Sequence, residues 1–242
     1  MVASLKIVHY KSLQSTNTTA YQLAQESAPE WTIVVADVQT RGRGRGRKKW
    51  DSPKGGLWFS ILLRPRIPSP RLPMLQFLAA VATRQAIENE TGLNAKLKWP
   101  NDLVLGTAKL GGILIKSKTL RDNVSFAILG IGLDVNQTQP QLPQGAVSLR
   151  LVSRKQYELR SLLGAILEQI RSSFNDLNHP SRIMEEWWRN CIHRPLRIQV
   201  TLGNDAVTGI STAIEEDGSL LIETDDRRIR RVNEGSLRIL DD

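Results

Sequence analysis

The sequence predicts an α+β protein with a large N-terminal part and a small, all-β C-terminal part. Short β-branched, apolar runs, typical of buried strands, alternate with helical patterns through the first part. Residues 72–91 have the apolar periodicity of a long helix. After Pro195 only short alternating strands joined by polar turns remain. We therefore expect two domains, residues 1–193 and residues 194–242.

The N-terminal segment is expected to form strands around one short helix. A strand at residues 5–10 precedes a helix that Ser15 or Thr16 can cap. The apolar segments at residues 32–37 and 57–64 are typical of buried strands.

The remaining elements follow in a clear order. Pro73 fits the first turn of the long helix, and Gly92 ends it. Two helices are expected within residues 158–190, with a break at His179 and Pro180. The last 50 or so residues predict a small barrel. Four further strands are expected at residues 96–99, 103–105, 110–117 and 125–135.

Composition places the chain among ordinary folded proteins. It has 242 residues, of which 40% are hydrophobic and 24% charged. The net charge is +9, and six cations lie within residues 41–49. The basicity is therefore local, which argues against a surface built for DNA.

Several function classes are not expected. The single cysteine permits no intrachain disulfide and suits the reducing cytoplasm. The three histidines are far apart, so we expect no protein-held metal site. No apolar run approaches the length of a membrane span, and the N-terminus lacks the apolar region of a signal peptide. We expect a soluble, cytoplasmic protein with no membrane partner.

The segment QTRGRGRGRKKW, residues 39–50, is the most unusual feature of the sequence. Its clustered cations repel one another, and its glycines make an ordered backbone costly. Such a segment either grips a polyanion such as RNA or waits for a small, highly charged ligand.

Four further motifs occur in a fixed order along the chain. They are STN (residues 15–17), KWPND (98–102), KLGGIL (109–114) and GIGLDVN (130–136). Together with the basic segment, this set resembles the biotin protein ligase family over nearly the whole chain. The resemblance implies a mixed sheet flanked by helices, like that of class II aminoacyl-tRNA synthetases, followed by an SH3-like barrel.

The resemblance also implies a two-step reaction. The carboxylate of biotin attacks the α-phosphate of ATP, and a lysine of the carrier protein then attacks the biotinyl-5'-AMP. The expected carrier is the biotin carboxyl carrier protein of acetyl-CoA carboxylase, and Mg²⁺ is expected to accompany ATP. Family members often form dimers, so a homodimer is a further expectation.

The basic segment has the groups that the first step needs. Fixed cations can neutralise the repulsion between a carboxylate and a polyphosphate, and arginine matches the oxygens of both. The resemblance implies that Arg43 and Arg45 contact the carboxyl and phosphate groups of biotinyl-5'-AMP. It also implies that Gln39 and Gly44 bind biotin and that Trp50 stacks on the adenine. We expect the loop to be mobile without ligand and to close over the adenylate. Its second half departs from the family pattern: Gly46 stands where arginine is common, and Arg47 where glycine is common.

Lys109 precedes two glycines, Gly111 and Gly112. An ammonium beside glycines that admit a ligand suits the biotin carboxylate and the transferring phosphate. The resemblance supports this role over that of a solvated lysine at a strand end. The two glycines are expected to let the strand approach biotin.

In KWPND, Asn101 and Asp102 have two interpretations. They could orient a metal-bound phosphate or the attacking lysine, since Mg²⁺ prefers few carboxylates together with substrate phosphates. They could also form an Asx-turn.

The STN motif and Asn136 can each be interpreted either as ligand-binding or as purely structural. Ser15, Thr16 and Asn17 can cap a helix, and in the family this turn meets the ureido ring of biotin. Asn136 could reach the nucleotide ribose or close a turn, and the turn is favoured slightly.

Three rival functions follow from the same features. A lipoate ligase would need a channel for an apolar dithiolane, and the basic loop with KWPND favours biotin instead. A nucleic-acid-binding protein is disfavoured, because the sequence has no RNP pattern of aromatics. A biotin-responsive repressor would need a helix-turn-helix ahead of STN, which begins here at Ser15. We expect a ligase without transcriptional control and no nucleic-acid partner.

Overall fold

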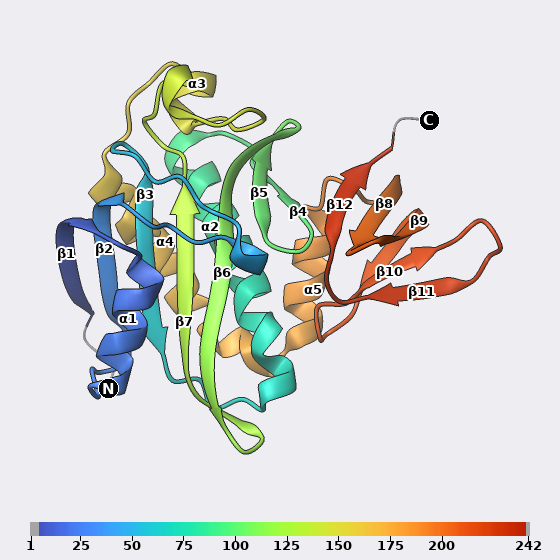
Figure 1. Ribbon diagram of the computed structural model, residues 1–242, viewed down its shortest axis with the longest axis horizontal. Helices are drawn as coiled ribbons and strands as arrows, with labels where there is room; N and C mark the ends of the chain where they lie inside the picture. Colours follow the sequence, from blue (N-terminus) through green and yellow to red (C-terminus); the bar gives the residue numbers. More distant parts are fainter. Residues whose placement is uncertain (1–4, 241–242) are drawn as a thin grey trace.

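A computed structural model describes residues 5–240 and contains a seven-stranded mixed sheet (Figure 1). The strand order is β1-β2-β3-β7-β6-β5-β4, in which β1 and β2 are parallel and every other neighbouring pair is antiparallel. The strands are β1 (Lys6–Leu13), β2 (Thr32–Gln39), β3 (Leu57–Leu63), β4 (Lys96–Lys98), β5 (Asp102–Leu105), β6 (Ala108–Leu120) and β7 (Asn123–Leu133).

Helices cover both faces of this sheet. One face carries α1 (Thr16–Gln25), which packs on β2, β3 and β7. The other face carries α2 (Leu72–Thr91), which packs against α4 (Leu159–Ser172) and α5 (Pro180–Arg189). Because β3 and β7 lie at the centre of the sheet, both of their faces are buried, which explains their near-continuous apolar sequence.

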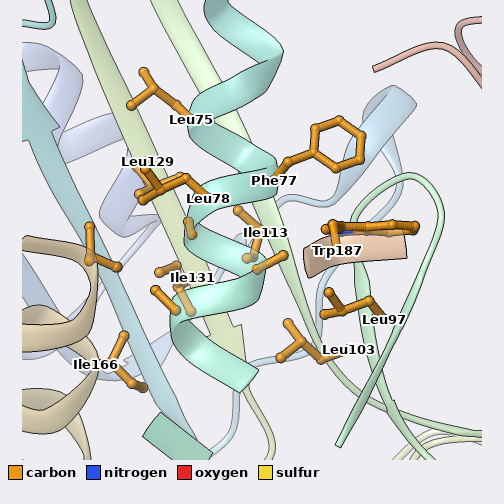
Figure 2. Packing of buried hydrophobic residues seen from close by; sticks show 14 of the residues in the cluster. Leu75, Phe77, Leu78, Leu97, Leu103, Ile113, Leu129, Ile131, Ile166 and Trp187 are labelled. Carbon is orange, nitrogen blue, oxygen red and sulfur yellow. The ribbon is translucent and has the colours of Figure 1, made fainter. Parts of the chain in front are cut away.

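The main core lies between the sheet and the long helix (Figure 2). Leu75 and Leu78 of α2 lie near Leu129 and Ile131 of β7. Phe77 extends from the same helix to Trp187 of α5, with ring centroids 5.3 Å apart. The long helix thus packs against β6 and β7, and residues of these two strands line the cavity described below.

The C-terminal domain is a five-stranded antiparallel, barrel-like sheet in the order β11-β10-β9-β8-β12. Its turn at Gly218 fits against the large domain: Trp99 Nε1 donates to the Gly218 carbonyl at 2.9 Å. A Cβ at Gly218 would lie 2.7 Å from Phe77, so only glycine fits here, and its φ of +85° also favours glycine. The strands are β8 (Arg197–Leu202), β9 (Asp205–Ile214), β10 (Leu220–Glu223), β11 (Ile229–Val232) and β12 (Ser236–Ile239).

The remaining elements are short. They are α3 (Leu149–Ser153) and the 3-10 turns η1 (Arg45–Arg47), η2 (Ser69–Arg71), η3 (Gln139–Gln141) and η4 (Phe174–Asn178). Among residues 5–240, no helix is both long and apolar enough to cross a membrane.

Candidate active site

A cavity of about 540 Å³ opens between the large sheet, the loop after β2 and the C-terminal domain. In Figure 1 this loop crosses in front of β7 and β6. The cavity brings together most residues that the sequence predicts for the site: Ser15, Thr16, Asn17, Gln39, Arg43, Gly44, Arg45, Trp50, Asn101, Asp102, Lys109 and Gly112. The predicted residues Gly111 and Asn136 are not part of its lining.

A buried polar cluster forms one end of the cavity. The backbone N–H of Thr16 donates to Gln39 Oε1 at 2.8 Å, and Gln39 Nε2 donates to Ser52 Oγ at 2.8 Å. Ser60 Oγ donates to Thr16 Oγ1 at 2.8 Å and lies 3.1 Å from Asn17 Oδ1. These bonds fix the orientation of each donor and acceptor, which is what recognition of a polar ring requires.

Helix α1 begins after Ser15, as expected, but the Ser15 side chain makes no capping hydrogen bond. Its hydroxyl is buried at the cavity. The capping interpretation of Ser15 is therefore wrong for its side chain.

Glycines in β6 and β7 make room for the side chains of the site. Gly112 and Gly132 are paired across the two strands, and the Trp50 ring lies against both. A Cβ at Gly132 would lie 2.8 Å from Trp50 Nε1, and one at Gly130 would lie 2.3 Å from the Asn17 side chain. A Cβ at Gly111 would instead meet Leu133 at 2.5 Å. Gly111 thus permits strand packing, whereas Gly112 borders the cavity.

Lys109 forms an ion pair with Asp102 in the cavity. Its Nζ lies 2.6 Å from Asp102 Oδ1 and 5.0 Å from the centroid of the Trp50 ring. Its side chain is 38% exposed, so the ammonium is neither buried nor freely solvated. The pairing of β5 with β6 explains the contact, because Val104 lies opposite Lys109 and Asp102, two residues before it on β5, points to the same face.

Asn101 has a structural contact of its own. Its Nδ2 donates to the Ile113 carbonyl at 2.8 Å, and its carbonyl accepts from the Ile113 N–H at 2.9 Å. These bonds tie the KWPND turn to β6. The Asn101 side chain therefore bonds to the neighbouring strand rather than forming a local Asx-turn, and it still borders the cavity.

The basic loop has a defined conformation. Gly44 N–H donates to the Lys48 carbonyl at 2.7 Å, and Gly46 has φ +61° and ψ 36°. This left-handed conformation favours glycine and explains the glycine at position 46. Arg45 Nη2 donates to the Gly235 carbonyl of the C-terminal domain, and Arg45 Cζ lies 6.0 Å from the Trp99 ring centroid. Arg45 therefore connects the loop to both domains.

Asp134 is a cavity residue that the sequence analysis did not single out. It follows β7 within GIGLDVN and is only 6% exposed. Burial raises its pKa from 3.8 to about 7, and the nearby charge of Lys109 opposes that rise. The sequence could have indicated Asp134 as a site residue through its place in the GIGLDVN motif, directly after a buried strand.

Asn136 closes a loop instead of facing the cavity. Its Nδ2 donates to the Tyr157 carbonyl at 2.8 Å, and its Oδ1 accepts from the Tyr157 N–H at 2.9 Å. Both ends of its amide are thus engaged by Tyr157, a residue distant in the chain, rather than by a local turn.

Other lining residues come from segments that sequence motifs did not mark. The backbone of Lys109 pairs with that of residues 145–147, which brings the proline-bearing loop over the cavity. The C-terminal domain contributes the residue before β12 and the first two residues of that strand. Residues of this kind are Gln141, Pro143, Ala146, Gly235, Ser236 and Leu237. In residues 5–240, no three His, Cys, Asp or Glu side chains are grouped so that they could hold a metal ion.

Comparison with protein families identifies this fold and cavity. The model of the biotin/lipoate A/B protein ligase family matches residues 10–136, and that of the biotin protein ligase C-terminal domain matches residues 197–236. The chain therefore belongs to the biotin protein ligases within the biotin/lipoate A/B protein ligase family, and it is a ligase enzyme.

Individual relatives agree with this assignment. The bifunctional ligase/repressor BirA of Bacillus subtilis is 35% identical over 229 residues, which are 91% of this chain and 70% of the relative. The biotin--[acetyl-CoA-carboxylase] ligase of Paracoccus denitrificans is 36% identical over 124 residues, 50% of this chain and 51% of the relative. The structure of a biotin protein ligase from Aquifex aeolicus in complex with biotin and ATP superposes with a TM-score of 0.83 at 27% identity, covering 97% of this chain and 99% of that one.

Proposed function

We propose that the protein activates biotin as biotinyl-5'-AMP and transfers it to one lysine of the biotin carboxyl carrier protein of acetyl-CoA carboxylase. The observation that carries the proposal is the composition of the cavity. A fixed polar cluster and the cations Arg43, Arg45 and Lys109 line the same space. The relative from Paracoccus denitrificans supports the choice of carrier.

The polar cluster suits the ureido ring of biotin. A ureido group has one carbonyl acceptor and two N–H donors, and the cluster around Thr16, Asn17 and Gln39 supplies donors and acceptors in fixed positions. The ring would lie beside this cluster, and the carboxylate would extend toward Lys109.

The first step then forms a bond between a biotin carboxylate oxygen and the α-phosphorus of ATP, and pyrophosphate leaves. Lys109 and Arg45 would lower the repulsion between the two anions, because their charges are already in place before the reaction. Trp50 would offer its ring to the adenine, and Asn101 borders the same space. The basic loop would exclude water from the mixed anhydride.

In the second step the carrier lysine amine attacks the acyl carbon. The new C–N bond replaces the C–O bond to AMP, and the amine loses one proton. Asp102, at the edge of the cavity, would orient the amine.

Mg²⁺ would arrive with ATP. Because the described residues hold no group of three ligating side chains, its ligands would be mainly phosphate oxygens, with Asp102 as the cavity carboxylate nearest Lys109. The ion would neutralise phosphate charge.

ATP–pyrophosphate exchange tests the proposal. We expect exchange that depends on biotin and is not supported by lipoate. Exchange with lipoate alone would show that the substrate is lipoate rather than biotin. Exchange with neither acid would contradict adenylation altogether.

The proposal includes ligation only. Residues 5–240 are accounted for by the catalytic fold and the C-terminal sheet, which supports the expectation of no repressor role within them. A cytoplasmic location, a homodimer and the absence of a nucleic-acid partner stay predictions.

A further inference from the structure

A second carboxylate borders the ion pair of Lys109 and Asp102. The strand order β5-β6-β7 places Lys109 between Asp102, at the start of β5, and Asp134, just after β7. The Asp134 N–H donates to the Leu110 carbonyl at 2.9 Å, so Asp134 lies beside the backbone that carries Lys109. All three side chains line the cavity.

The Asp134 carboxyl group is held in place by a buried amide. Gln137 Nε2 donates to Asp134 Oδ1 at 2.8 Å, and Gln137 Oε1 accepts from the Val135 N–H at 2.7 Å. The second bond fixes which end of the amide faces Asp134. Gln137 is fully buried, so this support is rigid.

The charged groups near Asp134 come from several parts of the protein. Lys109 of β6 is the cation that acts on it, and Asp102 of β5 competes for the same ammonium. Arg150 of α3 donates to the Asn136 carbonyl at 3.4 Å and is not a residue of the cavity lining. The other charged groups of the lining come from the KWPND turn, the basic loop and the residue that follows this loop: Lys98, Arg43, Arg45, Lys48, Lys49 and Asp51.

The charge balance beside Lys109 changes when an anion enters. One ammonium already faces two carboxyl groups, and a biotin carboxylate would be the third. Like charges at short range favour the neutral form of the most buried acid, and burial already favours neutral Asp134.

We propose that Asp134 takes up one proton from solvent when the carboxylate of biotin binds beside Lys109. The ligand's charge then replaces that of Asp134, and Lys109 remains paired with Asp102 and the ligand. This inference rests on the proposed function, since it requires biotin in this cavity. No bond to the ligand forms or breaks in this step.

Isothermal titration of biotin alone, without nucleotide or metal, tests the proposal. Two buffers of different ionisation heat are compared at each pH, phosphate and Tris at pH 8 and acetate and MES at pH 5.5, and the difference in observed heat gives the protons bound per biotin. For the wild-type protein we expect uptake of a large fraction of one proton at pH 8 and close to none at pH 5.5. Biotin affinity should weaken by up to roughly tenfold per pH unit above pH 7.

Asp134→Asn keeps an oxygen that can accept from Gln137, and it should abolish both the uptake and the pH dependence. Asp205→Asn, the same change at an exposed residue of β9, should behave like the wild type. Uptake that persists in Asp134→Asn would overturn the proposal, as would biotin binding by the wild type without uptake.

A measurement on the wild type alone covers the case in which Asp134→Asn does not fold. Infrared difference spectra at pH 8 should show a protonated-carboxyl band on addition of biotin, and the absence of this band would contradict the proposal. A wild-type protein that binds no biotin would instead overturn the proposed function, so the two failures are distinguishable.

Discussion

Lys109 is the residue at which the charges of the cavity meet. It pairs with Asp102, acts on Asp134 and lies over the Trp50 ring. A lysine at a strand end is ordinarily solvated, and the sequence alone distinguished this one only through its glycine neighbours and the family resemblance. The ion pair with Asp102 and the effect of the Lys109 charge on Asp134 both depend on strand order, which no local pattern encodes.

Replacing Lys109 by alanine should reduce biotin-dependent ATP–pyrophosphate exchange by roughly 100-fold or more, because a fixed cation is lost and Asp102 is left unpaired. The melting temperature should change by only a few degrees, since the side chain is partly exposed. Lys118→Ala, at an exposed position of the same strand, is the matched control and should retain full exchange. A collapse of the melting temperature in Lys109→Ala would indicate a structural role.

Asp134 should destabilise the fold as the pH rises. Burial raises the pKa of Asp134 from 3.8 to about 7, so the stability that its neutral form contributes is fully present below pH 3.8 and is lost as pH rises through about 7. Urea unfolding should therefore show Asp134→Asn gaining stability over the wild type by up to roughly 1.4 kcal/mol per pH unit between pH 4 and 7. A difference that does not vary with pH would contradict burial of this acid.

At the level of elements, the long helix and the central strands were predictable. Leu72–Thr91 was predicted with its bounds, because Pro73 and Gly92 mark its two ends and its apolar stripe is continuous. The short helix α3 was not predicted, because five residues contain too little periodicity. The loop after residue 136 lies over Lys109 because the backbone of Lys109 pairs with that of residues 145–147, and such a tertiary contact has no local sequence signal.

The basic loop is the element whose dynamics matter most for the reaction. It is tied to the rest of the protein through Arg45, the Trp50 ring and the Arg41 N–H, and Lys49 is paired with Asp51, but the six cations within residues 41–49 still repel one another. Trypsin should therefore cut within residues 41–49 readily in the free protein and several-fold more slowly with biotin and ATP present, as followed by mass spectrometry. Equal cleavage rates in both states would contradict ordering by the ligand.

At the level of the whole molecule, the two domains share one buried joint. His193 is fully buried and its Nε2 lies 3.2 Å from the Trp99 N–H, while Trp99 bonds to Gly218 across the joint. Arg45 reaches Gly235 from the other side of the cavity. The sequence predicted a C-terminal β-module but not its contribution to the site, because the turn before β12 carries no catalytic motif.

This joint should weaken in acid. Burial lowers the pKa of His193 from 6.5 to about 3, and the charge of Lys98 adds to the effect. The stability that neutral His193 contributes is thus present above pH 6.5 and lost as pH falls toward 3. His193→Gln, whose amide oxygen can accept from Trp99, should lose less stability on acidification, by up to roughly 1.4 kcal/mol per pH unit. Parallel unfolding curves for both proteins would show that His193 does not titrate.

The most direct test of the account is transfer itself. The purified protein, incubated with biotin, ATP, Mg²⁺ and a biotin carboxyl carrier protein, should add one biotinyl group to one lysine, as read by intact-mass and peptide mass spectrometry. A carrier that stays unmodified while the enzyme turns over ATP, or one labelled at many lysines, would contradict the assignment of the cavity as the site of specific biotin transfer.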